Sequence, residues 1–464
     1  MQNSNSRLFA DSEQGLRLPP MHGYLSFWSL IWTLPLTTVA GFSLSSDIAW
    51  ASPRDAFGID PQTMARAGAV TATAPPAAAA AANPALLIKT HGLEAEFGVV
   101  ASVPNVKAAA SDASSHETLD TYTGLNLGLA ISLPLGPIRD RLFAGIQTHL
   151  PTEALYTLDN TRQGDVVILH LGNQQRRFNL DAAVAVRIWE QISIGAGFYL
   201  VPDVAGDVAI DFSGDVQNSR SHVEVHAKFA PTAGIYAEPI EGLRLGIAYR
   251  GASKLSLNVP ARVYVSDAIG AIYTRLSGYA YAEPHIVSFG ASYDFSHLTE
   301  NPRLRFAAHL EFDYRHYADP IATSAEVTLY SENGDILSQT TQDYADFDDA
   351  WRIHTAIDWM PMDEICVSVG YAFEKTPVPP QRNIFNVLDA DRHQIAFGGT
   401  FWIPDAWLGG FGLGFSTAAK FDAYDTRHVE KYIFLAGTGN PGFPALSFSG
   451  MAFTWQGSIL MRFE

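Results

Sequence analysis

Cysteine is nearly absent from the 464-residue chain, which has only Cys366. An intramolecular disulfide and a thiolate zinc cluster are therefore excluded.

Charge is also scarce, at 17% of residues, against roughly 25% in soluble domains. Lys and Arg number 30 against 48 Asp and Glu, a net charge of −18, so we expect no nucleic-acid partner, which would need clustered basic residues. Aromatic residues reach 12%, which argues against disorder.

Long apolar runs are missing after residue 44. The one such run, 24–44, is followed by a small-x-small sequence at 49–51 and predicts a secretory signal peptide over 1–51, with Met1 or Met21 as the start. An uncleaved membrane anchor is the alternative, since the run is long enough to span a bilayer. Pro35 and the Ser and Thr content favour cleavage. We therefore expect an exported chain that does not depend on disulfides.

The next segment, 52–90, is rich in Ala, Gly and Pro and shows no strand alternation. Its small residues favour short helices and tight turns packed in a confined space. A flexible linker is the alternative interpretation.

From residue 91 onward apolar and polar residues alternate. Between 304 and 315 the even positions are apolar and most odd positions are ionic, from Leu304 to Tyr314 and from Arg305 to Arg315. Successive side chains of a strand point to opposite faces, so such a strand has one apolar and one ionic face. The pattern recurs near 222–229, 351–359 and 451–463.

Alternation predicts fourteen strands, whose connections alternate between short turns and longer polar loops. A soluble sandwich also alternates, but an even strand number with this loop asymmetry is typical of an outer-membrane β-barrel. A sheet in lipid must close, and fourteen strands leave a lumen, either open as a general pore or plugged by 52–90. The predicted strands lie near 91–104, 121–135, 141–157, 176–189, 192–210, 219–237, 243–265, 272–296, 303–318, 348–360, 363–374, 392–403, 408–424 and 450–464.

The polar faces raise the question of a metal site or an enzyme. His309, Glu311 and Asp313 share one face, as do His222, Glu224 and His226, and such spacing can present metal ligands. A water-facing lumen wall is the favoured interpretation, so we expect no metal site. No Gly-x-Ser-x-Gly or His-Glu-x-x-His motif occurs, so we expect neither an enzyme nor a cofactor, with a barrel lipid hydrolase as a less favoured alternative.

An acidic loop contains Asp343, Asp346, Asp348 and Asp349. It is interpreted as solvated rather than as a calcium site.

Three segments carry a resemblance to a known family. Residues 64–69 lead to Asn83-Pro84-Ala85, and 245–250 read Leu-Gly-Ile-Ala-Tyr-Arg. A third segment runs from Gly370 through 376–379 and Arg382 to 389–393. Together they resemble the FadL-type outer-membrane transporters of long-chain fatty acids and aromatic hydrocarbons.

This resemblance implies an all-β, 14-stranded antiparallel transmembrane barrel over 91–464, with an N-terminal hatch over 52–90 inside the lumen. The implied function is uptake of hydrophobic molecules such as long-chain fatty acids, with a general or weakly selective porin as the alternative. The implied location is the outer membrane of a Gram-negative bacterium, where the expected partners are apolar small molecules, membrane lipids and lipopolysaccharide, and we expect a monomer. The residues assigned to the hatch are Gly68, Asn83, Pro84 and Ala85.

The third segment supplies the candidate head-group contacts Arg382, Asp391 and Arg392. Two interpretations stay open. The arginines either tie the loop down through Asp389 and Asp391 or attract an anionic head group at the entrance. No motif fixes the residues that bind a carboxylate.

Overall fold

The computed structural model describes part of the chain, within the compact unit Leu44–Glu464. The predicted signal peptide lies outside the described residues, apart from Leu44–Ser46, which form strand β1 and pair with β5 (Asn160–Arg162). The described residues are 44–46, 53–110, 119–135, 141–153, 160–162, 166–169, 177–211, 218–266, 270–299, 301, 305–317, 325–330, 336–342, 347–382, 386–403, 411–432 and 443–463.

Fourteen antiparallel strands pair in sequence order and close into a ring when the last, β22, pairs with the first, β2. The predicted fold class is confirmed. Its strands are β2 (Leu93–Ala110), β3 (Tyr122–Ser132), β4 (Leu142–Pro151), β7 (Asn179–Trp189), β8 (Ile192–Asp211), β9 (Asn218–Ile240), β10 (Leu243–Arg250), β13 (His285–Asp294), β14 (Phe306–His316), β17 (Ala350–Met362), β18 (Ile365–Glu374), β20 (Arg392–Ile403), β21 (Phe411–Glu430) and β22 (Ala445–Phe463).

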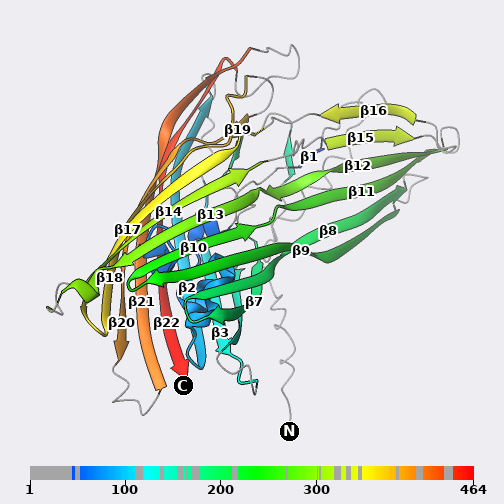
Figure 1. Cartoon of the computed structure of the whole chain (residues 1–464). Coiled ribbons are helices and arrows are strands. Elements are labelled where there is room, and N and C mark those ends of the chain that lie inside the picture. The colour runs from blue at the N-terminus through cyan, green and yellow to red at the C-terminus, as the bar shows by residue number, and fades with distance from the viewer. Residues whose placement is uncertain are drawn as a thin grey trace, which may run out of the picture. The chain divides into compact units, whose positions relative to one another are not determined.

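Two predicted strands were too long. The segment 243–265 divides at Gly251 into β10 and β11 (Ser253–Ser266), and 272–296 divides at Pro284 into β12 (Gly270–Glu283) and β13. Pro284 has no backbone donor, and the Gly251 N–H is taken by Pro231 O at 2.8 Å. Because β10 then pairs directly with β13, β11 and β12 leave the ring (Figure 1).

Further strands lie on the loops at the end of the barrel from which β11 and β12 extend. A hairpin that alternation did not predict, β15 (Ala325–Tyr330) and β16 (Ile336–Gln342), pairs with β12. β6 (Val166–Ile168) and β19 (Asn386–Leu388) form a small parallel sheet. We call this the long-loop end of the barrel and the opposite end the short-turn end.

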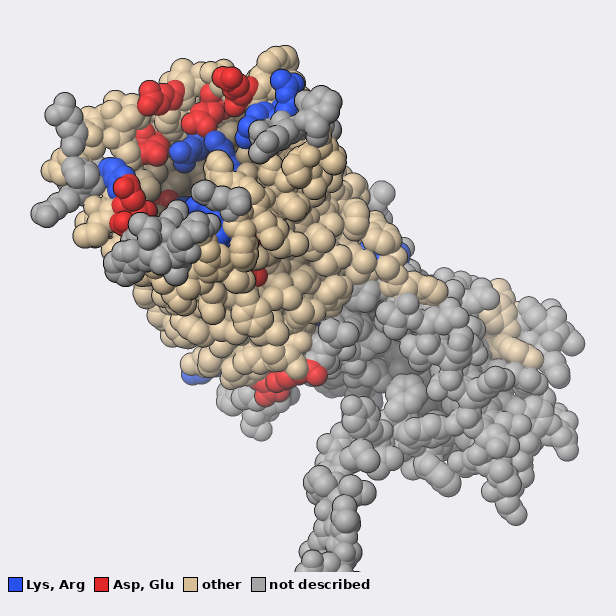
Figure 2. Space-filling model, turned by 90° about the horizontal axis from the view of Figure 1, so that it is seen from below, with Lys and Arg blue, Asp and Glu red and all other residues tan. Residues whose placement is uncertain are grey.

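The two faces of the ring differ in chemistry. On β14, Leu310 is 54% exposed on the outside, whereas Glu311 on the inside is 5% exposed. In Figure 2 the described flank of the barrel is almost free of charged residues, which gather around a hollow at one end. Within the described residues no helix is both long and apolar enough to cross a membrane.

Four short helices fill the interior of the ring (Figure 1) and form the hatch, residues 53–90. Each begins with proline, which has no N–H to leave unpaired in a first turn. Asp60 caps the second helix by accepting the Thr63 N–H at 2.7 Å. Short helices in a confined space were predicted here. Their bounds are α1 (Pro53–Phe57), α2 (Pro61–Ala65), α3 (Pro76–Ala82) and η2 (Pro84–Lys89).

The long-loop end contains two apolar clusters, in which side chains from the loops meet inward-facing residues of the wall. We call the two clusters together the outer core. Its members are Val106, Ala108, Ile168, Leu169, Tyr317, Ala350, Val378, Leu388, Ala390, Tyr424, Leu446, Phe448 and Ala452.

We expect the apolar outer face to control barrel stability through its contact with lipid. Leu310→Arg, near the middle of β14, should lower the free energy of unfolding in lipid by about 2–4 kcal/mol, because a charge at the bilayer midplane is poorly solvated. Phe306→Arg, on the same face but at the end of the strand, should cost about 0–1 kcal/mol. Urea titration in liposomes measures both, and equal losses would contradict the assignment of this face to lipid.

Candidate functional site

The candidate site is the contact between the hatch and the barrel wall, beginning with the predicted residues Asn83 and Pro84. Asn83 is fully buried, and its side-chain amide donates to Thr71 O at 2.7 Å and Ile235 O at 3.2 Å. Its Oδ1 accepts the Ala85 N–H at 3.1 Å. Asn83 thus joins two segments of the hatch, at Thr71 and Ala85, and links the hatch to β9.

The wall makes room for this turn with glycine. A Cβ on Gly234 would lie 1.9 Å from Asn83 Oδ1, and one on Gly195 would lie 2.4 Å from the Pro84 carbonyl carbon. The fully buried Ala85 accepts the Ser193 hydroxyl at 2.9 Å. Asn83, Pro84 and Ala85 therefore fit the wall too closely for a larger residue on either strand.

Gly68 is the remaining predicted hatch residue. Its φ of +86° is a conformation that glycine adopts without strain. A Cβ there would lie 3.0 Å from His354 Nδ1. That nitrogen is 2.7 Å from Ala67 O, so the turn at Gly68 is pressed against β17.

The first turn of the hatch is held by buried charges from three strands, β14, β17 and β18. Asp55 lies 2.8 Å from Arg315 and 3.7 Å from Arg352. Glu374 lies 3.0 Å from Arg315. Burial alone would raise the pKa of Asp55, but the guanidinium groups outweigh it and lower the pKa below its usual range. Asp55 therefore docks as a carboxylate.

Wall side chains also satisfy the hatch backbone. Lys420 Nζ donates to Ala56 O at 2.7 Å, and Gln456 donates to Phe57 O at 2.6 Å. Glu311 accepts the N–H groups of Val70 at 2.7 Å and Thr71 at 2.6 Å. These contacts pair backbone groups that would otherwise be buried without a partner.

The hatch has a second buried ion pair toward the short-turn end. Arg66 lies 2.8 Å from Asp358, which also lies 3.0 Å from His309 and accepts the Ser368 hydroxyl at 2.6 Å. Two cavities, of about 290 and 210 Å³, both reach Arg66 from this end.

Opposite the charges, the hatch packs through small and apolar residues. Hatch residues of this packing include Ala79, Ala80, Leu86 and Leu87, and they contact Phe143, Ala183 and Tyr236 of the wall, among others. The hatch therefore has a mainly ionic side, against β14 to β21, and a mainly apolar side, against β3 to β9. The mainly apolar side also has an ion pair at its edge, in which Lys89 lies 3.0 Å from Glu238.

One prediction about the wall was wrong. The ionic face of β14 was interpreted as facing water, yet His309, Glu311 and Asp313 are 5–6% exposed. The hatch covers them and uses them as partners. The side chains of His222 and Glu224 lie outside the described residues.

The predicted loop residues have different partners. Arg392 is 1% exposed at the start of β20, where it pairs with Glu374 and donates to Asp55 O at 3.3 Å. Arg382 is exposed, with its guanidinium 4.9 Å from the Tyr432 ring centroid. Asp391 accepts the Thr376 N–H at 2.9 Å.

The loop is fastened through Asp389 and Asp391, and Thr376 and Arg427 are among their partners. Asp389 accepts the Thr376 hydroxyl through its side chain and Arg427 through its backbone oxygen at 2.9 Å. In the acidic loop, Asp349 accepts from His316 and from the Tyr317 N–H, both at 3.0 Å. Asp343 and Asp346 lie outside the described residues.

Sequence reasoning missed Asp55, Arg315, Arg352 and Glu374, which make the main ionic contact. The available signal was the run of charged residues at inward positions of neighbouring strands. A charge enclosed in a barrel needs a partner, and the hatch was the segment to search for it.

The model of the outer membrane protein transport protein family (OMPP1/FadL/TodX) matches residues 45–408. The chain belongs to this family. Its members are Gram-negative outer-membrane proteins that transport hydrophobic small molecules, which places this chain in the outer membrane. They are transport channels rather than enzymes.

Solved structures share the fold. A Pseudomonas aeruginosa FadL homologue has a TM-score of 0.56 at 13% identity, covering 87% of this chain and 98% of its own. The toluene transporter TodX of P. putida has a TM-score of 0.55 at 13% identity, covering 90% of this chain and 100% of its own. The toluene transporter TbuX of Ralstonia pickettii has a TM-score of 0.51 at 10% identity, covering 88% of this chain and 99% of its own. No curated protein matches the sequence.

We expect Asp55→Asn to loosen the hatch while leaving the barrel folded. Removing this carboxylate leaves Arg315 and Arg352 short of a counter-charge, and breaking a buried ion pair costs about 3–5 kcal/mol. Hydrogen exchange at the amides of 54–58 should become correspondingly faster than in the wild type. Unchanged exchange would show that the ion pair does not hold the hatch.

The matched control is Asp60→Asn, which removes a buried carboxylate of the same segment. Burial raises the pKa of Asp60 from 3.8 to about 6, so the docked hatch binds this proton more tightly than the free chain. Docking should therefore weaken as the pH rises from 3.8 to about 6. Asp60→Asn should remove this pH dependence and slow hydrogen exchange at neutral pH. Faster exchange in this variant would contradict the assignment.

Proposed function

We propose that this chain takes up long-chain fatty acids by passive diffusion, with the hatch as its gate. The supporting observation is that inward charges which would line the channel of an open porin are paired with the hatch instead. A route for small polar solutes through the described lumen would have to pass the buried ion pairs of Asp55 with Arg315 and Arg352.

The outer core is the proposed binding site. Its apolar side chains lie at the long-loop end, which in outer-membrane barrels faces the outside of the cell. Burying an alkyl chain there contributes about 25 cal/mol per Å² of apolar surface. An apolar molecule, which water excludes from an ordinary porin, would be stabilised at this site.

A buried lysine next to the outer core favours a carboxylate as the head group. Lys431 is 5% exposed, and its Nζ donates to Gln381 O at 2.7 Å. It lies two positions after Val429, which pairs with Leu446 of the outer core. Burial lowers the pKa of Lys431 to about 8, so an anion placed nearby would stabilise its charged form. Aromatic hydrocarbons are the alternative substrate, because two of the solved structures above are toluene transporters. Such molecules have no charge and would not use Lys431.

Two matched ligands test this proposal. The Lys431→Met variant should bind palmitic acid on the order of tenfold more weakly, the loss of one charge-assisted contact. Its affinity for hexadecanol, which has the same chain and no charge, should equal that of the wild type. Isothermal titration in detergent gives both affinities, with Lys375→Met, an exposed lysine at the same end, as the control variant.

The measurement also separates the alternatives. Equal losses for acid and alcohol would remove Lys431 as the head-group contact. Binding of toluene but of neither long-chain ligand would replace fatty acids with aromatic hydrocarbons. Rapid entry of small sugars into liposomes without binding of any apolar ligand would indicate a general porin.

A further inference from the structure

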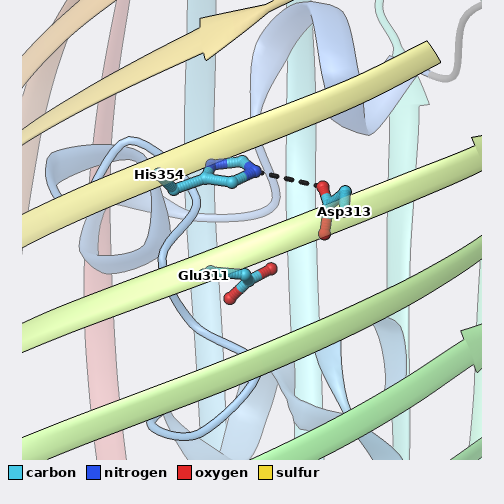
Figure 3. A group of neighbouring side chains, drawn as sticks. All are labelled: Glu311, Asp313 and His354. Carbon is cyan, nitrogen blue, oxygen red and sulfur yellow. Dashed lines mark hydrogen bonds and ion pairs between the residues drawn. The ribbon is translucent and has the colours of Figure 1, made fainter.

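Three buried side chains from two adjacent strands of the wall converge beside the turn at Gly68 (Figure 3). Glu311 and Asp313 are two positions apart on β14, and β17 places His354 directly opposite Glu311. One donor atom from each lies within 4.8 Å of the others. Among the residues considered as metal ligands from the sequence, Glu311 and Asp313 remain together, and His354 takes the place of His309.

The hydrogen bonding of His354 fixes which nitrogen is free. Its Nδ1 is 2.7 Å from Ala67 O, a carbonyl that only accepts, so Nδ1 carries hydrogen. In the neutral ring Nε2 then directs a lone pair at Asp313 Oδ2, 3.0 Å away. Contact at this distance requires positive charge at Nε2, which either a second proton on the ring or a bound cation supplies. Histidines that bind metals commonly donate their other N–H to a backbone carbonyl in this way.

The described residues leave one carboxylate oxygen of the group unpaired. Asp313 Oδ1 is buried with no hydrogen-bond partner among them. Glu311 holds the N–H groups of Val70 and Thr71 through Oε2. All three side chains line one cavity of about 100 Å³, enough for an ion and a water molecule at roughly 30 Å³ per water.

Acidic and basic side chains are balanced around the site. Arg54, Arg315, Arg352 and Lys420 line the same cavity as Asp55 and the three candidate ligands. Arg315 and Arg352 are matched by Asp55 and Glu374. With His354 neutral, the connected network contains as many carboxylates as basic groups. The carboxylates are Asp55, Glu311, Asp313, Glu374 and Asp422, and the basic groups are Arg54, Arg315, Arg352, Arg392 and Lys420.

We propose that Glu311, Asp313 and His354 bind a divalent first-row transition-metal ion, of the Zn²⁺ class, and that the ion stabilises the docked hatch. One imidazole and two carboxylates suit such an ion better than Ca²⁺, which takes oxygen ligands only. Bonds of about 2.1 Å require the donors to close in by roughly 1 Å. The ion would act on the hatch because Glu311 and His354 hold its backbone at 67, 70 and 71.

Titration of ZnCl₂ into the full chain, purified in detergent and freed of metal by a chelator, tests binding without any substrate. We expect one tightly bound ion per chain. Asp313→Asn and His354→Gln should each weaken binding on the order of a hundredfold. His149→Gln is the matched control, because this buried histidine contacts the neutral Asn126 and Tyr122 and should leave binding unchanged.

Hydrogen exchange in the wild type tests the effect on the hatch and does not depend on the variants folding. With Zn²⁺ the amides of Val70 and Thr71 should exchange about tenfold more slowly than with chelator. No binding by the wild type, or binding that Asp313→Asn and His354→Gln leave unchanged, would overturn the site. Binding without slower exchange would overturn the effect on the hatch. Protection that follows pH but not Zn²⁺ would show a doubly protonated His354 in place of a metal.

Discussion

A polar group enclosed in a closed barrel must find its partner inside that barrel, and this constraint organises the whole molecule. The ring satisfies its own backbone, because each of its strands pairs with two others. The hatch has too few internal hydrogen bonds to do the same, so its carbonyl and N–H groups take partners from the wall. The side chains of Lys420, Gln456 and Glu311 form hydrogen bonds with the hatch backbone. The inward polar groups of the wall and the backbone of the hatch therefore satisfy each other.

The alternation of residues predicted the ring but not its extensions. The apolar outer positions and the even strand number follow from a sheet that has lipid on one side. Where β11 and β12 continue β10 and β13 beyond the ring, the local pattern does not change at Gly251 or Pro284, so one strand was predicted in place of two. The division depends on pairing between distant strands, since β10 pairs with β9 on one side and with β13 on the other.

The hatch residues were found by a short motif, whereas their partners were not. Asn83, Pro84 and Ala85 form one local turn, which a motif can identify. Asp55 lies in a segment without periodicity, and nothing in it indicates Arg315, 260 residues away. His354 and Glu311 lie on strands predicted as consecutive, but the long loop between them sets no register, so their alignment required the structure.

The two sides of the hatch differ in what it takes to release them. Buried ion pairs add little net stability compared with apolar packing, but breaking one leaves an uncompensated charge. The ionic side, around Asp55 and Arg66, therefore fixes one position and resists small shifts. On the mainly apolar side, Leu86, Leu87 and the alanines of α3 lose contact area when they move, and the turn at 83–85 loses neutral hydrogen bonds to β8 and β9 but no buried charge pair. We infer that movement is easier on this side, because a hydrophobic passenger supplies an apolar surface comparable to the one it displaces.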